Sequence, residues 1–281
     1  MDGVALADTN LPPHEQAQVR AGATLAQKVA FLRDAGSYPH AAGAVVAIET
    51  HMSWVFLAGE RAYKLKKPIH LPYLDFSTLE KREAACQAEF ALNRRLAPAL
   101  YLGVMPLCES NEGLNLRGEG PIVDWLVVMR RIDEGLMLEA AIPRHALAPE
   151  RLHALERKLG QFYRHARPVF ATPQKYLAGW RRQLEWNRDV LNVPRLSMPI
   201  ASILLIDGAQ RRFLARCGYQ LVGRLQRQKI IDGHGDLRPE HIWLGEPLSI
   251  IDCLEFNAEF RAVDPFADLS YLAIECARLG A

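Results

Sequence analysis

The stretch 231–256 constrains the fold more than any other part of this sequence. It reads IDGHGDLRPEHIWLGEPLSIIDCLEF. Two short apolar runs, 241–244 and 248–251, are separated by Gly-Glu-Pro, which is typical of a hairpin loop. The sequence therefore predicts two short antiparallel strands that start and finish at the same end of a hairpin.

The turn of this hairpin also determines which side chains meet. With the loop centred on its Glu-Pro step, His241 lies opposite Asp252 at the open end. Asp236 comes five residues before His241, in a His-Gly-Asp loop. Taken singly, these residue types are common in turns. Together, two carboxylates and an imidazole beside a glycine-containing loop suit a divalent cation and a proton acceptor.

The order HGDLxxxH, hairpin, IID resembles the catalytic core of the aminoglycoside phosphotransferase and choline kinase family, which has the protein-kinase fold. The resemblance implies that Asp236 is the catalytic base, with His234 of the same motif counted as catalytic, and that Asp252 is a magnesium ligand. The family has Asn, a second metal ligand, where this chain has His241. Imidazole binds softer divalent ions better than Mg²⁺, so Mn²⁺ is expected to serve beside Mg²⁺. Arg238, in the same loop, is expected to support the site.

A basic run after the turn at residues 58–60 predicts a strand. In Arg-Ala-Tyr-Lys-Leu-Lys-Lys, residues 61–67, alternation puts Ala62, Lys64 and Lys66 on one face. One interpretation is an edge strand whose lysines discourage aggregation. Kinase-like folds, however, carry Ala-x-Lys on their third strand. The resemblance implies that Ala62 makes room for adenine and that Lys64 reaches the α- and β-phosphates.

Residues 76–96 predict a helix that begins with a capping box, in which Ser77 is the N-cap and Glu80 the third helical residue. Kinase-like folds carry a glutamate on this helix that pairs with the strand lysine. The resemblance assigns that place to Glu89, within about 4 Å of Lys64. The alternative is that Glu89 belongs to a solvated helix face, as its many charged neighbours do.

Two further segments complete the resemblance. Residues 122–129 form a strongly apolar strand with a polar exit over 130–135, and in the family this is the hinge where backbone near Met129 and Arg131 binds the adenine edge. Near the C-terminus, Asp-Pro-Phe-Ala-Asp-Leu matches the family's DPxxDL. Its second aspartate, Asp268, is expected to hold the catalytic loop through hydrogen bonds, although a simple helix N-cap fits the same pattern.

These elements together predict an α+β, bilobal, protein-kinase-like fold. An N-terminal arm and helix are expected over 1–40, a nucleotide-binding lobe of antiparallel sheet and helix over 41–135, and a helical lobe with the catalytic loop and metal-binding hairpin over 136–281. Runs such as AYKLKKP and LDFSTLEKRE look closest to bacterial aminoglycoside phosphotransferase-like proteins that are often fused to a P-loop kinase domain. The chain contains no GxxxxGK[ST], so any P-loop domain is absent from it. The resemblance to those fused proteins implies a separate or fused P-loop kinase partner. The C-terminus looks short for the family.

Composition and charge bear on the partners and the cellular compartment of the protein. The net charge of the 281 residues is +2, and no long Lys/Arg run indicates a nucleic-acid partner. No signal peptide is recognisable, and the longest apolar run is too short to span a bilayer. The cysteines are odd in number and scattered, which predicts reduced thiols in a cytoplasm: Cys86, Cys108, Cys217, Cys253 and Cys276.

The sequence therefore favours ATP-dependent phosphoryl transfer to a hydroxyl of a small molecule, with ATP and Mg²⁺ as cofactors. Two alternatives stay open. The first is a nucleotide-binding pseudoenzyme, suggested by His241 and the short C-terminus. The second is a metal-dependent hydrolase with His234, Asp236, His241 and Asp252 as ligands.

Overall fold

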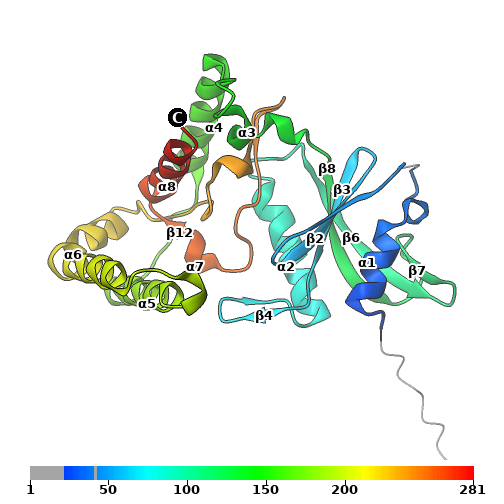
Figure 1. Ribbon diagram of the computed structural model, residues 1–281, viewed down its shortest axis with the longest axis horizontal. Helices are drawn as coiled ribbons and strands as arrows, with labels where there is room; N and C mark the ends of the chain where they lie inside the picture. The colour runs from blue at the N-terminus through cyan, green and yellow to red at the C-terminus, as the bar shows by residue number, and fades with distance from the viewer. Residues whose placement is uncertain (1–21, 41–42) are drawn as a thin grey trace, which may run out of the picture.

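The computed structural model describes residues 22–40 and 43–281. Of the N-terminal arm and helix expected over 1–40, residues 1–21 lie outside the described residues. The rest forms an N-terminal antiparallel sheet flanked by two helices, followed by a mainly helical C-terminal part (Figure 1). The predicted α+β class, with a kinase-like order of sheet first and helices second, is confirmed.

The sheet contains six strands in the order β1-β2-β3-β8-β6-β7, all antiparallel. Their bounds are β1 (Val46–Glu49), β2 (Ser53–Ala58), β3 (Arg61–Lys66), β6 (Tyr101–Ser110), β7 (Gly113–Asn115) and β8 (Ile122–Arg130). Strand β2 begins at Ser53 and not earlier. Residues 50–52 turn the chain instead, because the Thr50 hydroxyl accepts a hydrogen bond from the Ser53 N–H at 3.0 Å.

The two faces of the sheet are covered by different helices. Tyr63 and Leu65 of β3 are fully buried in a cluster with Leu32 of α1 (Leu25–Arg33). On the other face, Cys86 of α2 (Leu79–Asn93) packs against Val127 of β8. The predicted alternation of β3 is therefore confirmed, and the face that carries its lysines is turned toward α2.

The N-terminus of α2 differs from the prediction by one residue. Thr78 is the N-cap and accepts a hydrogen bond from Lys81 N–H, whereas Ser77 donates its N–H and hydroxyl to Asp75. Ser77 is therefore engaged in the turn before the helix and cannot cap it. Asp75 ends a small hairpin of β4 (His70–Leu71) and β5 (Leu74–Asp75).

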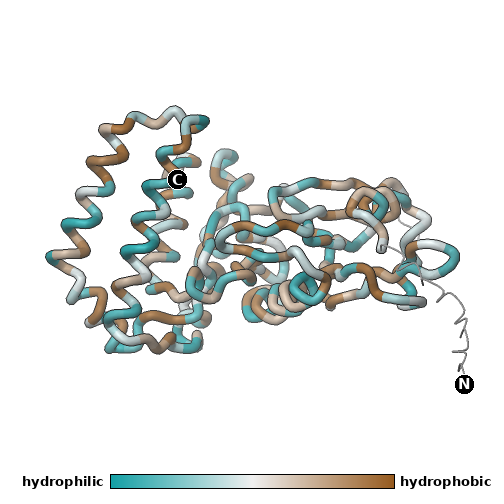
Figure 2. The backbone as a smooth tube through the Cα atoms, turned by 90° about the horizontal axis from the view of Figure 1, so that it is seen from below, coloured by the Kyte–Doolittle hydropathy of each residue, from teal (hydrophilic) through white to brown (hydrophobic). Residues whose placement is uncertain are grey.

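Helices dominate the C-terminal part. They are α3 (Leu138–Ala141), α4 (Pro149–His165), α5 (Pro173–Leu191), α6 (Ile200–Gln226), α7 (Ala258–Arg261) and α8 (Pro265–Arg278). Helix α6 begins at Ile200, so the apolar run that starts there is part of this helix. The long pair α5–α6 lies at the end of the molecule farthest from the sheet (Figure 2). Among the described helices, none is both long and apolar enough to cross a membrane.

The predicted hairpin is present, with a corrected register. β10 (Ile242–Trp243) pairs with β11 (Ser249–Ile250), and Ile242 lies opposite Ile250. His241 is therefore opposite Ile251, not Asp252. Both Ile242 and Ile250 are fully buried in the core of the helical part. A shift of one residue would turn buried side chains toward solvent, so packing selects the observed register. A second short pair consists of β9 (Ile231–Asp232) and β12 (Ala262–Val263), and β9 leads directly into the His-Gly-Asp loop.

Candidate active site

Five of the residues singled out in the sequence form one connected group between the sheet and the helical part. Lys64 Nζ lies 2.9 Å from Glu89 Oε1 and 2.7 Å from Asp252 Oδ1. His241 Nε2 lies 3.7 Å from Asp252 Oδ2, and His241 Nδ1 lies 3.8 Å from Asp236 Oδ2. Strand β3, helix α2, the hairpin and the His-Gly-Asp loop therefore all contribute to a single site.

The ion pair expected across the sheet and α2 is present. Glu89 is buried, and Lys64 is only 16% exposed at its side chain. Burial would lower the pKa of Lys64, but the Asp252 and Glu89 carboxylates outweigh burial and hold that pKa well above its usual value. Lys64 is therefore a fixed ammonium at the inner edge of the site.

Glu89 has a second partner that the sequence did not indicate. Lys66, two residues along the same face of β3, lies 2.6 Å from Glu89 Oε2 and 2.5 Å from Glu255 Oε1. The edge-strand interpretation of the lysines is therefore wrong for Lys66, whose side chain is buried. It also fails for the strand as a whole, because β3 lies between β2 and β8 and is not at an edge of the sheet. Lys67 lies just beyond β3 and pairs with the half-exposed Glu49.

The backbone of the His-Gly-Asp loop is held by Asp268. Its carboxylate accepts hydrogen bonds from the N–H groups of His234 at 3.1 Å and Gly235 at 3.3 Å. Gly235 has φ +84°, and a Cβ there would lie 2.9 Å from the Phe260 carbonyl oxygen, so the loop requires glycine. The expected hydrogen bonds from Asp268 are thus seen. Asp264, not Asp268, is the N-cap of α8.

His234 differs from the expectation that it is catalytic. Its side chain is fully buried, its Nε2 lies 2.9 Å from the Ile251 carbonyl oxygen, and its Nδ1 lies 3.3 Å from the Asp236 N–H. A carbonyl only accepts, so Nε2 carries the proton and Nδ1 accepts. Burial, reinforced by His241, lowers the pKa of His234 to about 4. Both ring nitrogens of His234 are therefore engaged with backbone groups of the site.

Asp236 faces the cleft beside this buried histidine. Burial raises the pKa of its carboxyl group above the usual value, although His241 and Arg238 act in the opposite direction. A carboxylate with a raised pKa is a better proton acceptor than an exposed one. Arg238 itself forms an ion pair with Glu240 at 2.7 Å.

The orientation of His241 leaves one nitrogen lone pair facing the site. Its Nδ1 lies 2.8 Å from the Asp236 carbonyl oxygen, so Nδ1 carries the proton in the neutral ring. Nε2 is then unprotonated and faces Asp252. A backbone carbonyl that orients an imidazole in this way is the usual support for a metal-ligating histidine.

Asp252 sits at the end of the hairpin in an uncommon backbone conformation, with φ +60°. Burial would raise the pKa of its carboxyl group, but Lys64 and then His241 outweigh burial and hold that pKa well below the usual range. The carboxylate is therefore ionised. Ligands in an octahedral shell of 2.0–2.1 Å bonds lie about 3 Å apart, so Asp252 Oδ2 and His241 Nε2 are close enough to share a divalent cation.

The structure does not bring together the ligand set of a hydrolase. His234 would have to give up two backbone hydrogen bonds to bind a metal ion. Within 22–40 and 43–281, no group of three or more His, Cys, Asp or Glu side chains is arranged to hold a metal ion.

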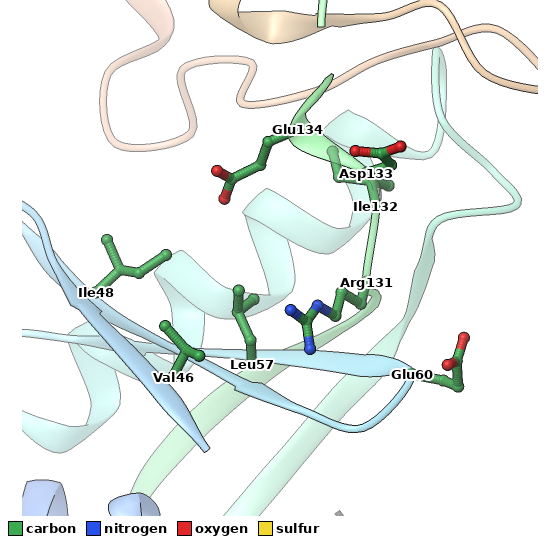
Figure 3. A pocket seen from close by; sticks show the side chains of 8 residues that line it. All are labelled: Val46, Ile48, Leu57, Glu60, Arg131, Ile132, Asp133 and Glu134. Carbon is green, nitrogen blue, oxygen red and sulfur yellow. The ribbon is translucent and has the colours of Figure 1, made fainter. Parts of the chain in front are cut away.

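A pocket of about 590 Å³ opens beside the lysine strand, between the sheet and the segment that follows β8. Val46, Ile48 and Leu57 rise from β1 and β2 toward residues 131–134 (Figure 3). Its floor is thus apolar and its rim is charged. Ala62 lies two residues before Lys64 on the same strand and is buried.

Met129 and Arg131, the two residues expected to bind the adenine edge, lie differently with respect to the pocket. Met129 is paired within the sheet to both Ala62 and Tyr101, and it is not among the residues that line the pocket. Arg131 does line the pocket, but its N–H donates to the Glu60 carbonyl oxygen at 2.9 Å. In the described part of the chain, the N–H of Ile132 has no acceptor. Ile132 is therefore the first backbone donor available to a ligand.

Two polar residues at the end of α2 were missed by the sequence analysis. Asn93 Oδ1 accepts the Cys253 N–H at 2.9 Å, and Arg95 donates to the carbonyl oxygens of Asp232 and Gly233. They tie α2 to both loops of the site. The signal was present in LNRRL, where a buried Asn precedes an arginine, but its partners lie more than 130 residues away.

Comparisons with known proteins give relatives without a described activity. No family model matches the sequence. The uncharacterized proteins Mb2027c of Mycobacterium bovis and Rv2004c of Mycobacterium tuberculosis are each 33% identical to this chain over 239 residues, which is 83% of the chain and 46% of the relative. The chain thus spans about half the length of these relatives.

One similar solved structure is a choline/ethanolamine kinase family protein from Mesorhizobium loti. It is 17% identical to this chain, with a TM-score of 0.44, and the match covers 89% of this chain and 71% of that one. Because the TM-score is low, we base no conclusion about function on this similarity.

Proposed function

We propose that this protein is an ATP-dependent phosphotransferase that acts on a hydroxyl group of a small molecule. The observation that carries the proposal is the Lys64 ammonium, held between Glu89 at 2.9 Å and Asp252 at 2.7 Å, on the strand that pairs with the apolar floor strand β2 of the pocket. A cation fixed by a buried carboxylate is ordered before a phosphate arrives, so little further ordering is needed for binding.

ATP would enter with its base in the pocket. The adenine ring would lie over Val46, Ile48 and Leu57, and its edge would meet the N–H of Ile132. Ala62 leaves room for the ring beside the strand. The α- and β-phosphates would then lie at Lys64.

Asp252 and His241 would hold the divalent cation. When bound, the cation supplies positive charge against the phosphate oxygens as charge moves toward the leaving group. A carboxylate oxygen with an imidazole nitrogen is a mixed donor set, which favours Mn²⁺ relative to a site made only of oxygens. Asp252 stays ionised for this role because Lys64 stabilises its charge.

Asp236 would orient the acceptor hydroxyl and take its proton. The raised pKa of its carboxyl group suits a base that releases the proton again after transfer. His234 and Asp268 would keep the loop in place without contacting the reacting atoms. Arg238, paired with Glu240, would border the acceptor side.

The remaining length of the mycobacterial relatives leaves room for a second functional unit. We propose that this unit includes the P-loop kinase domain implied by the sequence, as a fused or separate partner of the phosphotransferase.

The decisive experiment is an ATP-consumption screen over hydroxyl-bearing metabolites, with Mg²⁺ and with Mn²⁺. ADP formation that depends on one acceptor supports the proposal. Tight nucleotide binding without acceptor-dependent turnover, also in a chain extended beyond Ala281, favours the pseudoenzyme. A tightly held transition metal together with hydrolysis in the absence of ATP favours the hydrolase.

A further inference from the structure

Strand β3 presents two lysines to the same buried glutamate. Lys64 Nζ lies 2.9 Å from Glu89 Oε1, and Lys66 Nζ lies 2.6 Å from Glu89 Oε2. Only the contact from Lys66 has the alignment of a hydrogen bond. One glutamate thus serves two ammonium groups, and their surroundings determine which one is free to meet a nucleotide.

Lys66 is enclosed on every side that the structure describes. Its side chain is 1% exposed and lies between the carboxylates of Glu89 and Glu255, with the Phe76 ring 4.9 Å from its ammonium. Lys64 is more exposed and contacts Asp252 in the cleft. Lys64 therefore can reach a phosphate, whereas Lys66 cannot do so without leaving the Glu255 carboxylate buried and without its ion pair.

Glu255 belongs to the segment that carries the proposed metal ligand. It lies three residues after Asp252. The backbone of Leu254 bonds to His234 and Arg261, and three further contacts join the segment 252–255 to β3 and α2. Asp252 contacts Lys64, the Cys253 N–H donates to Asn93, and Glu255 contacts Lys66. Two of these contacts go to β3 and one goes to α2.

The first of the three contacts is the one that catalysis must break. In the proposed reaction, Lys64 turns from Asp252 to the phosphates while Asp252 turns to the cation. Of the three contacts, those of Cys253 with α2 and of Glu255 with β3 would then remain. If Lys64 were the sole partner of Glu89, this movement would also weaken the ion pair that fixes Glu89.

We propose that Lys66 and Glu255 form a buried tether that holds the Asp252 segment against β3 and α2, and that both are positioning residues for Lys64 and Asp252. This inference rests on the proposed phosphotransferase function for its effect on nucleotide binding. The tether itself is a property of the chain without nucleotide. It also balances charge, because Lys64, Lys66, Glu89 and Glu255 sum to zero and leave the negative charge of Asp252 for the cation.

The test uses the double variant Lys66→Met/Glu255→Gln. It removes one charge of each sign and keeps similar side-chain volumes, so no buried charge is stranded as it would be in Lys66→Met alone. The matched control is Lys67→Met/Glu49→Gln, which removes the neighbouring ion pair of 2.6 Å whose carboxylate is 54% exposed. Thermal unfolding of each variant establishes that it is folded.

The first measurement is amide hydrogen exchange over residues 251–256 in the absence of nucleotide. The double variant should exchange at least about 10-fold faster there than the parent, whereas the control should match the parent. Unchanged exchange in the double variant overturns the tether. This readout needs no knowledge of the acceptor and no nucleotide binding.

The second measurement is calorimetry of Mg²⁺–ATP binding. The double variant should bind about 10-fold more weakly or worse, the size expected when a group that orients a metal ligand is lost. Faster exchange with unchanged affinity would overturn the positioning role. Failure of the parent to bind Mg²⁺–ATP would instead refute the proposed function, and the exchange data would still decide on the tether.

Discussion

The buried His234 makes a quantitative prediction about acid stability. In the unfolded chain its pKa is about 6.5, and burial lowers its pKa to about 4 in the folded protein. A group whose folded pKa is depressed takes up its proton more readily when unfolded, so its contribution to stability is complete above about pH 6.5 and declines as the pH falls toward 4.

The difference between these two pKa values corresponds to about 3 kcal/mol once the pH is below both. Between pH 8 and pH 5, His234 alone should lower the free energy of unfolding by about 2 kcal/mol, because the unfolded imidazole is then almost fully protonated and the folded one is not. The main physical cause is burial, which disfavours the charged imidazolium. Protonation of His234 Nδ1 would also remove the acceptor of the Asp236 N–H.

The assay is urea unfolding of the parent and of His234→Gln at pH 8 and pH 5. Glutamine has an amide that can donate to the Ile251 carbonyl oxygen but does not titrate in this range. The variant will be less stable at pH 8, and carboxylates will give both proteins some acid dependence. The parent should nevertheless lose about 2 kcal/mol more than the variant between the two pH values. Equal losses would refute the buried neutral imidazole.

Four further variants test the proposed roles. Asp252→Asn, which tolerates φ +60°, should abolish metal-dependent ATP binding in calorimetry while thermal unfolding shows an intact fold; unchanged affinity counts against the kinase reading. Asp236→Asn should bind ATP like the parent and lose acceptor-dependent turnover, and an equal loss of binding would make Asp236 a metal ligand. His241→Asn should shift the metal preference of turnover from Mn²⁺ toward Mg²⁺, and the same preference in both proteins would exclude His241 from the site. Asp268→Ala leaves two backbone N–H groups without their acceptor and should lower the free energy of unfolding by about 2 kcal/mol or more, measured in urea; a smaller loss would show that water replaces the carboxylate.

Local patterns were sufficient to find the main contacts of the site. Alternation along β3 put Lys64 and Lys66 on one face, because it depends on the regular geometry of a single strand. The resemblance to kinase-like folds then selected Lys64 and gave Glu89 as its partner, and the two lie 2.9 Å apart. The hairpin was predicted from its Gly-Glu-Pro turn. Its register was wrong by one residue, because burial of Ile242 and Ile250 decides the register and their packing is a property of the whole core.

Contacts between distant segments could not be predicted in this way. Lys66 was interpreted as an edge-strand lysine, since nothing near it in the sequence indicates that Glu255, 189 residues later, is its partner. His234 was assigned a catalytic role because the motif contains it, and only the folded protein places both of its nitrogens against backbone groups. The residues of the site were thus predicted from motifs and the resemblance they carry, whereas the residues that support them depend on tertiary packing.

Because Glu89 has two lysine partners, a substitution of Lys64 can remove the proposed activity without unfolding the protein. Where a buried glutamate has a single lysine partner, removing that lysine leaves a buried carboxylate without an ion pair. The variant is then unstable and is degraded in the cell, so its activity has no effect. Here Lys66 remains 2.6 Å from Glu89 when Lys64 is replaced. We therefore expect that the chain can lose Lys64, its proposed phosphate-binding ammonium, and still accumulate as a folded protein, so that an inactive descendant persists as a scaffold.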